Sequence, residues 1–270
     1  MNLKSYLRSD AQFINQQMTF LFLAVLTTTQ MASIILVLIF LFLGFKLMET
    51  TWSYRISKPH QWETALKAGQ VPKKLRKLER FYRDKVRFYT FWFQIERLKK
   101  EMVPGVFAEV GVYKGETARL IHEMDPSRSL YLFDTFEGFS KEDLAHENTN
   151  DEKINSIDFS DTSVESVRQY IDGNSNITFY QGHFPSTTEK MGAEKYAFVH
   201  LDADLYQPTL AALKYFYPKL SRGGVIMVHD YNHDWEGARR AVDEFAREIP
   251  ENLIEIADWQ GSAVIVRNKI

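Results

Sequence analysis

The fold is decided by the stretch Tyr196-Ala197-Phe198-Val199-His200-Leu201-Asp202-Ala203-Asp204-Leu205-Tyr206, an apolar strand-like run that leads directly into two carboxylates. A second stretch repeats this arrangement, because Gly224-Val225-Ile226-Met227 leads into Val228-His229-Asp230-Tyr231. In an open parallel sheet, ligands collect at the carboxyl ends of the strands. Two consecutive strand ends therefore predict one site, suited to a hard divalent cation or to proton transfer, that contains Asp202, Asp204, His229 and Asp230.

Carboxylates that directly follow a strand also have a plainer explanation, because they commonly cap the next helix. One such stretch would favour that explanation, whereas two consecutive strand ends favour a site. For Asp204 the two interpretations stay equal, since a helix is expected to begin near Pro208.

The sequence around these stretches predicts an α/β protein with a doubly wound, mostly parallel sheet and a C-terminal antiparallel hairpin. After Pro104-Gly105, short apolar runs alternate with helix-length segments, which is typical of βαβ units. The expected strands are Val106–Val110, Ser129–Phe133, Ile177–Tyr180, Tyr196–Leu201 and Val225–Val228. The expected helices are Thr117–Met124, Ser163–Ile171, Thr209–Leu220 and Gly237–Glu248. The final runs, Leu253–Ala257 and Ala263–Val266, flank a hairpin turn.

The first expected strand leads into the glycine turn Gly111-Val112-Tyr113-Lys114-Gly115. Glycines allow a tight turn and a close approach of the backbone to a ligand at the start of a helix. The G-x-G-x-x-G spacing of nicotinamide dinucleotide sites is not met. Glu109 precedes the turn, and Asp134 ends the next strand, where a carboxylate accepts hydrogen bonds from ribose hydroxyls. Together these residues suit a ligand that is a nucleoside with a cationic tail, and S-adenosylmethionine is such a molecule.

The ordered motifs resemble those of a known family. They are Phe107–Ala118, Phe133–Phe139, Gly182–Thr187 and the two acidic strand ends. This set is similar to the macrocin O-methyltransferase family, class I S-adenosylmethionine-dependent enzymes that methylate sugar hydroxyls on natural products. The resemblance covers roughly residues 88–270 and excludes the N-terminal segment.

The resemblance implies a cofactor site, because positions that bind the cofactor in the family match residues of this chain one by one. Glu109, Gly111 and Gly115 would line the methionine end of S-adenosylmethionine. Asp134 would contact the ribose, and Gly182-His183-Phe184 would lie on the adenine side.

The resemblance also implies a metal, usually magnesium, held by Asp202 and Asp230 and binding the acceptor hydroxyls. The family often has an acidic residue directly before the position of Asp230, whereas this chain has His229. That difference removes a negative charge, so His229 is expected either to join Asp202 and Asp230 as a metal ligand or to act as a base. Asp204 is the other candidate base.

The expected function is therefore that of a membrane-anchored, metal-assisted O-methyltransferase acting on a sugar hydroxyl of a glycan, glycolipid or glycosylated small molecule. The alternative is a membrane-tethered binding or scaffold protein with a non-catalytic fold of this class, because a fold does not fix a function. The acidic strand ends favour the enzyme, because a site that has lost its activity has no need for mutually repelling carboxylates. The polar stretch Ser140–Asp161, an expected acceptor loop, does not identify the acceptor.

Composition excludes several classes of partner and site. Lys and Arg number 33 against 35 Asp and Glu, so the net charge of −2 gives no reason to expect nucleic-acid binding. The absence of cysteine excludes disulfides and thiolate metal sites. Association into a homo-oligomer stays open.

The N-terminal region predicts a single membrane-spanning helix. Residues 18–45 carry no charge, and Ile34–Leu43 is apolar on all sides, which meets the roughly 20 apolar residues that a span requires. A cleaved signal peptide is disfavoured because the run ends in Phe45-Lys46-Leu47-Met48, a poor cleavage site. A buried core helix is disfavoured because no face of the segment is polar enough to meet water. The expected organisation is a tail at 1–17, a span at 18–45 in contact with membrane lipids, a connector at 46–104 and a methyltransferase domain at 105–270.

Basic residues are denser after the expected span than before it, which places the C-terminal portion on the cytoplasmic side. The connector between residues 71 and 103 is both basic and aromatic. From Phe88 onward its aromatic side chains are expected to pack on the domain. Before Phe88, helical spacing brings together a face suited to anionic headgroups that consists of Leu78, Phe81, Tyr82 and Lys85.

Overall fold

The computed structural model describes residues 3–147, 159–173, 175–233 and 236–268. Its contacts divide the chain into two compact units, Met1–Ala68 and Gly69–Ile270. Residues 148–158 of the expected acceptor loop lie outside the described residues.

The first unit consists of α1 (Leu3–Ser57) and α2 (His60–Lys67). Within α1, Ile14–Thr50 contains an 18-residue window with a mean hydropathy of 2.5 and is, by length and composition alone, long and apolar enough to cross a membrane. The side chains of Ile34–Leu43 are between 48% and 73% exposed. Helix α1 extends beyond the expected span at both ends and takes in most of the expected tail.

The polar residues inside this apolar stretch satisfy their hydroxyl groups within the helix. The Thr28 and Thr29 hydroxyls both donate to the Val25 carbonyl, at 2.8 and 3.0 Å, and Ser33 donates to the Thr29 carbonyl at 2.9 Å. The structure shows the backbone bonds, which lower the cost of placing a hydroxyl in an apolar environment.

The second unit is built on one sheet. Among the described residues its seven strands run in the order β3-β2-β1-β4-β5-β7-β6. Their bounds are β1 (Val106–Val110), β2 (Leu130–Asp134), β3 (Ile177–Gln181), β4 (Tyr196–Leu201), β5 (Leu220–Val228), β6 (Ile254–Ile256) and β7 (Ser262–Val266). The first five strands pair in parallel, and β7 runs antiparallel to both β5 and β6. The predicted mixed sheet with its C-terminal hairpin is confirmed.

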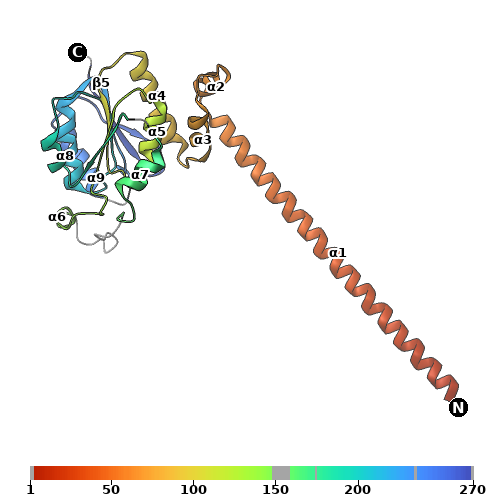
Figure 1. Cartoon of the computed structure of the whole chain (residues 1–270). Coiled ribbons are helices and arrows are strands. Elements are labelled where there is room, and N and C mark those ends of the chain that lie inside the picture. The colour runs from red at the N-terminus through yellow and green to blue at the C-terminus, as the bar shows by residue number, and fades with distance from the viewer. Residues whose placement is uncertain (1–2, 148–158, 174, 234–235, 269–270) are drawn as a thin grey trace. The chain divides into compact units, whose positions relative to one another are not determined.

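Helices cover both faces of the sheet (Figure 1). Helices α4, α5 and α7 lie on one side, and α8 and α9 on the other. The helices of this unit are α3 (Lys73–Phe81), α4 (Lys85–Lys100), α5 (Glu116–Met124), α6 (Lys141–Leu144), α7 (Val164–Ile171), α8 (Tyr206–Phe216) and α9 (Glu236–Ala246), with short 3-10 turns η1 (Ser186–Lys190) and η2 (Tyr217–Lys219). Because both faces are covered, the central strand β4 is buried along its whole length and is apolar except for the Tyr196 hydroxyl and His200.

Helix α4 packs on the sheet through an apolar stripe, as predicted for the connector after Phe88. Phe88, Phe91, Ile95 and Leu98 are fully buried. The Phe91 ring meets the Phe198 ring of β4 edge-on, with ring centroids 5.7 Å apart. Helices α3 and α4 therefore belong to the second unit, whose contacts begin at Gly69 rather than near residue 105.

The expected headgroup-facing surface before Phe88 is wrong in one respect. Helix α3 ends at Phe81, which is 69% exposed, and the chain turns so that Tyr82 is buried. Tyr82 lies against Phe88, with ring centroids 6.4 Å apart. The helical spacing used in the prediction does not hold across the end of the helix, so Phe81 and Tyr82 do not share an exposed face.

Candidate active site

A pocket of about 500 Å³ opens at the carboxyl ends of β1, β2, β4 and β5. In the sheet, β2 and β3 lie on one side of β1, whereas β4 and β5 lie on its other side. Such a reversal of strand order leaves a crevice at the sheet edge, which is where ligands bind in doubly wound folds. The volume lies within the usual range for small-molecule sites.

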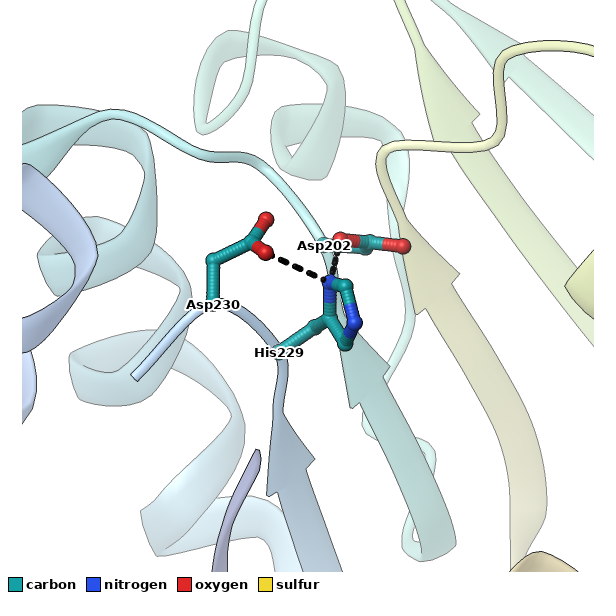
Figure 2. Close-up of side chains that lie close together, drawn as sticks. All are labelled: Asp202, His229 and Asp230. Carbon is teal, nitrogen blue, oxygen red and sulfur yellow. Dashed lines mark hydrogen bonds and ion pairs between the residues drawn. The ribbon is translucent and has the colours of Figure 1, made fainter. Parts of the chain in front are cut away.

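Asp202, His229 and Asp230 meet at this edge, as the sequence predicted (Figure 2). Asp202 directly follows β4, and His229 and Asp230 directly follow β5. The His229 Nδ1 atom lies 2.9 Å from Asp202 Oδ1 and 3.1 Å from Asp230 Oδ1. His229 and Asp230 are each only 4% exposed, whereas the Asp202 side chain is 24% exposed, so the cluster is shielded from water except on the side of Asp202.

The charges in this cluster reinforce one another. Burial alone would lower the pKa of His229, but the negative charges of Asp202 and Asp230 and the hydrogen bond to Asp202 raise that pKa to about 10. Burial would raise the pKa of Asp202, and the neighbouring His229 instead holds it below its usual range. The cluster is therefore an imidazolium between carboxylates when it holds no other cation.

The same donors fit a divalent cation. Each of the three residues offers one ligand atom, and these atoms lie within 4.8 Å of one another. Asp230 Oδ1 is buried and accepts no hydrogen bond from the described residues. Two carboxylates and an imidazole form a donor set used by divalent metals, provided that the imidazole is neutral. A metal would thus take the place of the Nδ1 proton.

Asp204 is the fourth acidic residue predicted for the site, and it lines the same pocket. Its backbone is left-handed, with φ at 60°. Burial, and then the negative charges of Asp202 and Asp230, raise the pKa of Asp204 well above its usual range. Helix α8 begins at Tyr206 with Leu205 as its N-cap and no side-chain cap bond, so the capping role that the sequence left open for Asp204 is wrong.

Glu109 lies on the floor of the pocket, at the end of β1. It is 1% exposed, and its Oε1 atom shares a hydrogen bond of 2.9 Å with Nδ1 of His200 on β4. Its other oxygen, Oε2, is buried and has no hydrogen-bond partner among the described residues. Burial raises the pKa of Glu109 well above its usual range, and burial lowers the pKa of His200 to about 3. Glu109 is therefore an acidic group that a ligand's cation would stabilise in its charged form.

Asp134 organises the glycine turn. Its Oδ2 accepts from the backbone N–H groups of Val112 and Tyr113, at 2.6 and 2.8 Å, and its Oδ1 accepts from that of Phe136 at 2.7 Å. The sequence predicted a contact to ribose but not these three bonds. A carboxylate has about four acceptor positions, so one stays free for a ligand hydroxyl.

The two glycines of the turn have different roles. Gly111 lines the pocket, and a Cβ atom there would lie 1.9 Å from the Asp202 carbonyl oxygen. Gly115 is not among the described residues that line the pocket. It is the left-handed N-cap of α5, and a Cβ atom there would lie 2.7 Å from Val167 of α7. Gly115 thus serves helix packing, a role for which the motif alone gave no signal.

The predicted adenine-side residues also line the pocket. His183 is held by Asp143 of α6, with Nε2 and Oδ2 2.7 Å apart. Phe184 is 5% exposed and lies parallel to Phe216, with ring centroids 5.7 Å apart. Gly182 continues β3 in a left-handed conformation, with φ at 135°. These residues form a wall that is apolar at Phe184 and polar at His183.

Several lining residues were missed by the sequence analysis. Tyr82 directly follows α3, Asp84 and Arg87 come from the start of α4, and Trp259 comes from the β6–β7 turn. Arg87 did have a sequence signal, because it lies four residues before Phe91 and so falls on the buried stripe of α4. A charged residue on a buried stripe is unusual and often indicates a site.

Comparisons with known proteins agree with this architecture. The sequence profile described as Macrocin-O-methyltransferase (TylF) matches residues 81–268. A Streptomyces olivaceus 8-demethyl-8-(2,3-dimethoxy-alpha-L-rhamnosyl)-tetracenomycin-C 4'-O-methyltransferase is 27% identical over 163 residues, covering 56% of this chain and 61% of that protein. A Micromonospora griseorubida mycinamicin III 3''-O-methyltransferase is 28% identical over 183 residues, covering 62% of this chain and 70% of that protein. The match thus spans less than two thirds of the first relative.

Solved structures share the fold. The O-methyltransferase NovP superposes with a TM-score of 0.56 at 24% identity, covering 68% of this chain and 80% of NovP. The calicheamicin methyltransferase CalS11 superposes with a TM-score of 0.54 at 19% identity, covering 78% of this chain and 93% of CalS11. These likenesses show a class I methyltransferase-like fold. With the profile matching most of the chain, the protein belongs to the macrocin O-methyltransferase family.

Proposed function

We propose that this protein is an S-adenosylmethionine-dependent O-methyltransferase that acts on a sugar hydroxyl. The observation that carries the proposal is one pocket that contains both Glu109 and Asp134, suited to a cationic nucleoside, and the acidic cluster at Asp202 and Asp230. The names of two relatives, methyltransferases of a rhamnosyl-tetracenomycin and of mycinamicin, support a glycosylated acceptor.

In this proposal the cofactor lies across the ends of β1 and β2. Glu109 binds the cationic amino-acid end, and the remaining acceptor position of Asp134 binds a ribose hydroxyl. His183 and Phe184 flank the adenine. The sulfonium methyl would then face the acidic cluster, where an acceptor oxygen in line with it can attack.

Asp202, His229 and Asp230 would hold a divalent metal. Such a metal would act as a Lewis acid that lowers the pKa of the bound acceptor hydroxyl. Magnesium prefers oxygen ligands, whereas an imidazole ligand favours zinc, iron or similar ions. The residues fit a divalent cation, and the metal is part of the proposal.

Asp204 is the proposed base. His229 is the poorer candidate, because its Nδ1 atom carries a proton when the cluster holds no metal, with its pKa raised to about 10, and would be a ligand when a metal is bound. Burial and nearby negative charge raise the pKa of Asp204, which makes its carboxylate a stronger base than an ordinary aspartate. The positive sulfonium of a bound cofactor would favour its ionised form.

The proposal includes a membrane anchor formed by α1, with the second unit on the cytoplasmic side. The length and apolar composition of Ile14–Thr50 support the anchor. The excess of Lys and Arg after this stretch supports the orientation. A glycolipid or a lipid-linked sugar would then be the natural class of acceptor.

The test is methyl transfer by the detergent-solubilised full chain with labelled S-adenosylmethionine and a panel of glycolipids and glycosylated small molecules. We expect labelled product, loss of turnover in EDTA and recovery on adding a divalent metal. Asp204→Asn should lower the rate by about 10²- to 10⁴-fold without weakening cofactor binding. Asp172→Asn is the matched control, because that side chain is 73% exposed on the C-cap of α7.

Two results would contradict parts of this proposal. Full turnover in metal-free buffer would remove the metal and leave a purely protein-based acid–base site. Cofactor binding without methyl transfer to any acceptor would instead favour a binding or scaffold protein that has kept the fold.

A further inference from the structure

Arg87 is a buried cation that the proposed chemistry does not yet use. The residue is 9% exposed, comes from the first turn of α4 and lines the pocket. Its Nε–H group is buried and has no hydrogen-bond acceptor among the described residues. A buried guanidinium without a full set of partners is costly to desolvate, which points to a ligand that supplies the missing acceptors.

Two carboxylates hold Arg87 in place without satisfying its hydrogen bonds. The Nε atom is 4.0 Å from Asp84 Oδ2 and 4.0 Å from Asp258 Oδ2, beyond hydrogen-bond distance. Both of those oxygens already accept bonds elsewhere, from the Trp259 backbone N–H at 2.7 Å and from the Ser262 hydroxyl at 2.6 Å. The carboxylates therefore keep the guanidinium charged and aligned while its N–H groups stay available.

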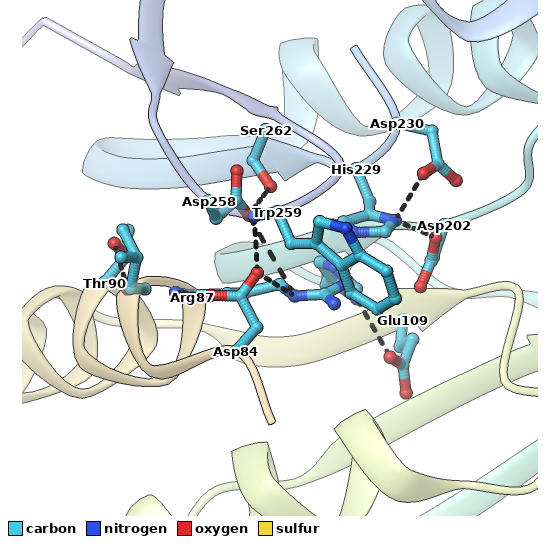
Figure 3. Close-up of polar contacts among 12 residues, drawn as sticks. Asp84, Arg87, Thr90, Glu109, Asp202, His229, Asp230, Asp258, Trp259 and Ser262 are labelled. Carbon is cyan, nitrogen blue, oxygen red and sulfur yellow. Dashed lines mark hydrogen bonds and ion pairs between the residues drawn. The ribbon is translucent and has the colours of Figure 1, made fainter. Parts of the chain in front are cut away.

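The charge of Arg87 reaches the floor of the pocket. Figure 3 shows its side chain extending from α4 past Asp84 and Asp258 toward Glu109 and Asp202. Its positive charge partly offsets the effect of burial on the pKa of Glu109 and helps to hold the pKa of Asp202 low. Arg87 and Glu109 thus lie at the same end of the pocket, and neither satisfies the other's free hydrogen-bonding atom.

A buried guanidinium and a buried carboxyl group that do not pair with each other are complementary to a zwitterion, whose ammonium group would stabilise the ionised carboxylate. We propose that Arg87 completes the binding site for the α-amino acid end of the cofactor by donating to its carboxylate, while Glu109, already assigned to this end of the cofactor, faces its ammonium group. The inference rests on the proposed function and deepens it, because it makes α4, a helix before the first strand, part of the cofactor site. A guanidinium suits this role because its planar fork matches a carboxylate.

The acceptor is the other molecule that Arg87 could contact, and depth in the pocket decides against it. Trp259, at the mouth, is 75% exposed, whereas Arg87 is 9% exposed and Glu109 is 1% exposed. The glycine turn begins at Gly111, two residues after Glu109, and also lines the pocket. Arg87 therefore lies on the cofactor side rather than at the open face.

The experiment compares three ligands by calorimetric titration of the detergent-solubilised full chain. S-adenosylmethionine carries the whole amino acid, decarboxylated S-adenosylmethionine lacks only the carboxylate, and 5'-methylthioadenosine lacks the amino acid entirely. We expect the native chain to bind the first about 10- to 100-fold more tightly than the second, the range of a charge-assisted hydrogen-bonded contact. In Arg87→Met this preference should fall to within about two- to threefold, with 5'-methylthioadenosine binding unchanged.

Two further variants keep the test decisive. Arg76→Met removes the same charge from an exposed side chain of α3 that is not among the described residues lining the pocket, and it should leave the preference intact. If Arg87→Met does not fold, Arg87→Lys retains the charge without the planar fork and should still reduce the preference.

The inference and the proposed function fail in different ways. If the native chain binds none of the three ligands, the proposed function falls and takes the inference with it. If the native chain binds them but Arg87→Met weakens the affinity for all three ligands equally, the inference alone is overturned. It is also overturned if Arg87→Met leaves all three affinities unchanged and raises only the KM of the acceptor.

Discussion

Gly111 joins the two halves of the site at the scale of a single residue. It follows β1, has a φ of 83°, and lies so close to the end of β4 that a Cβ atom would come within 1.9 Å of the Asp202 carbonyl oxygen. Its backbone N–H also donates to the Phe133 carbonyl of β2 at 2.9 Å. The glycine is thus required by contact between two strand ends, and it sets the position of the residue that begins the acidic cluster.

We expect Gly111→Ala to lower the free energy of unfolding by about 2–5 kcal/mol. This is the sum of the cost of holding an alanine in a left-handed conformation and the cost of the backbone shift that its Cβ atom forces. Gly69→Ala is the control, since Gly69 also has a positive φ, 70°, but has no atom within 4 Å of the added Cβ. It should cost only about 1–2 kcal/mol. Denaturant unfolding measures both, and equal losses would show that the approach to Asp202 is not the cause.

At the scale of elements, the start of α4 is tied to the β6–β7 turn. Asp84 is the N-cap of α4 and accepts from the Arg87 backbone N–H at 2.9 Å. Its second oxygen accepts from the Trp259 backbone N–H, 175 residues away in the chain. One carboxylate therefore ends the turn before α4, positions Arg87 and holds the loop at the mouth of the pocket.

Asp84→Ala should cost about 0.5–2 kcal/mol of stability through the lost cap and should also weaken cofactor binding, because Arg87 and Trp259 lose a shared partner. Ser163→Ala is the matched control. Ser163 caps α7 with a full capping box and does not belong to the described lining of the pocket. It should show a similar loss of stability with unchanged cofactor affinity. Denaturant unfolding and calorimetry separate the two effects, and unchanged cofactor affinity in Asp84→Ala would contradict the link.

At the scale of the whole molecule, the chain combines an apolar helix with a catalytic-type domain. The apolar side chains of α1 between residues 34 and 43 are exposed on all sides, which water does not tolerate over such a length. The second unit, in contrast, has an extensive buried core on both faces of its sheet. The two units therefore suit different solvents, and this difference is the physical argument for an anchor.

The anchor predicts that the full chain stays with membranes after washing in high salt and in alkaline carbonate. Leu38→Arg combined with Leu41→Arg should release it, because each arginine near the centre of a span costs about 2.5–3.5 kcal/mol. Leu38→Ala combined with Leu41→Ala is the control and should stay in the membrane fraction. Release of the native chain by high salt alone would contradict the span. In sealed inside-out vesicles, protease should reach the second unit, and protection there would reverse the orientation.

The sequence by itself determined the mixed sheet with its C-terminal hairpin and the residues of the acidic cluster. These features depend on short local patterns, such as an apolar run followed by Asp202 or by His229 and Asp230, and parallel strands bring such ends to one edge. The glycine turn and Asp134 were predicted for the same reason.

Only the tertiary structure decided how these groups are partnered. The Glu109–His200 pair joins residues 91 apart, and Arg87 acquires its place from Asp84 beside it and from Asp258 far along the chain. The two turn glycines have the same motif but different neighbours, Asp202 for Gly111 and Val167 for Gly115. Such contacts depend on which side chains meet after the helices pack on the sheet, and no local pattern of polarity or spacing encodes them.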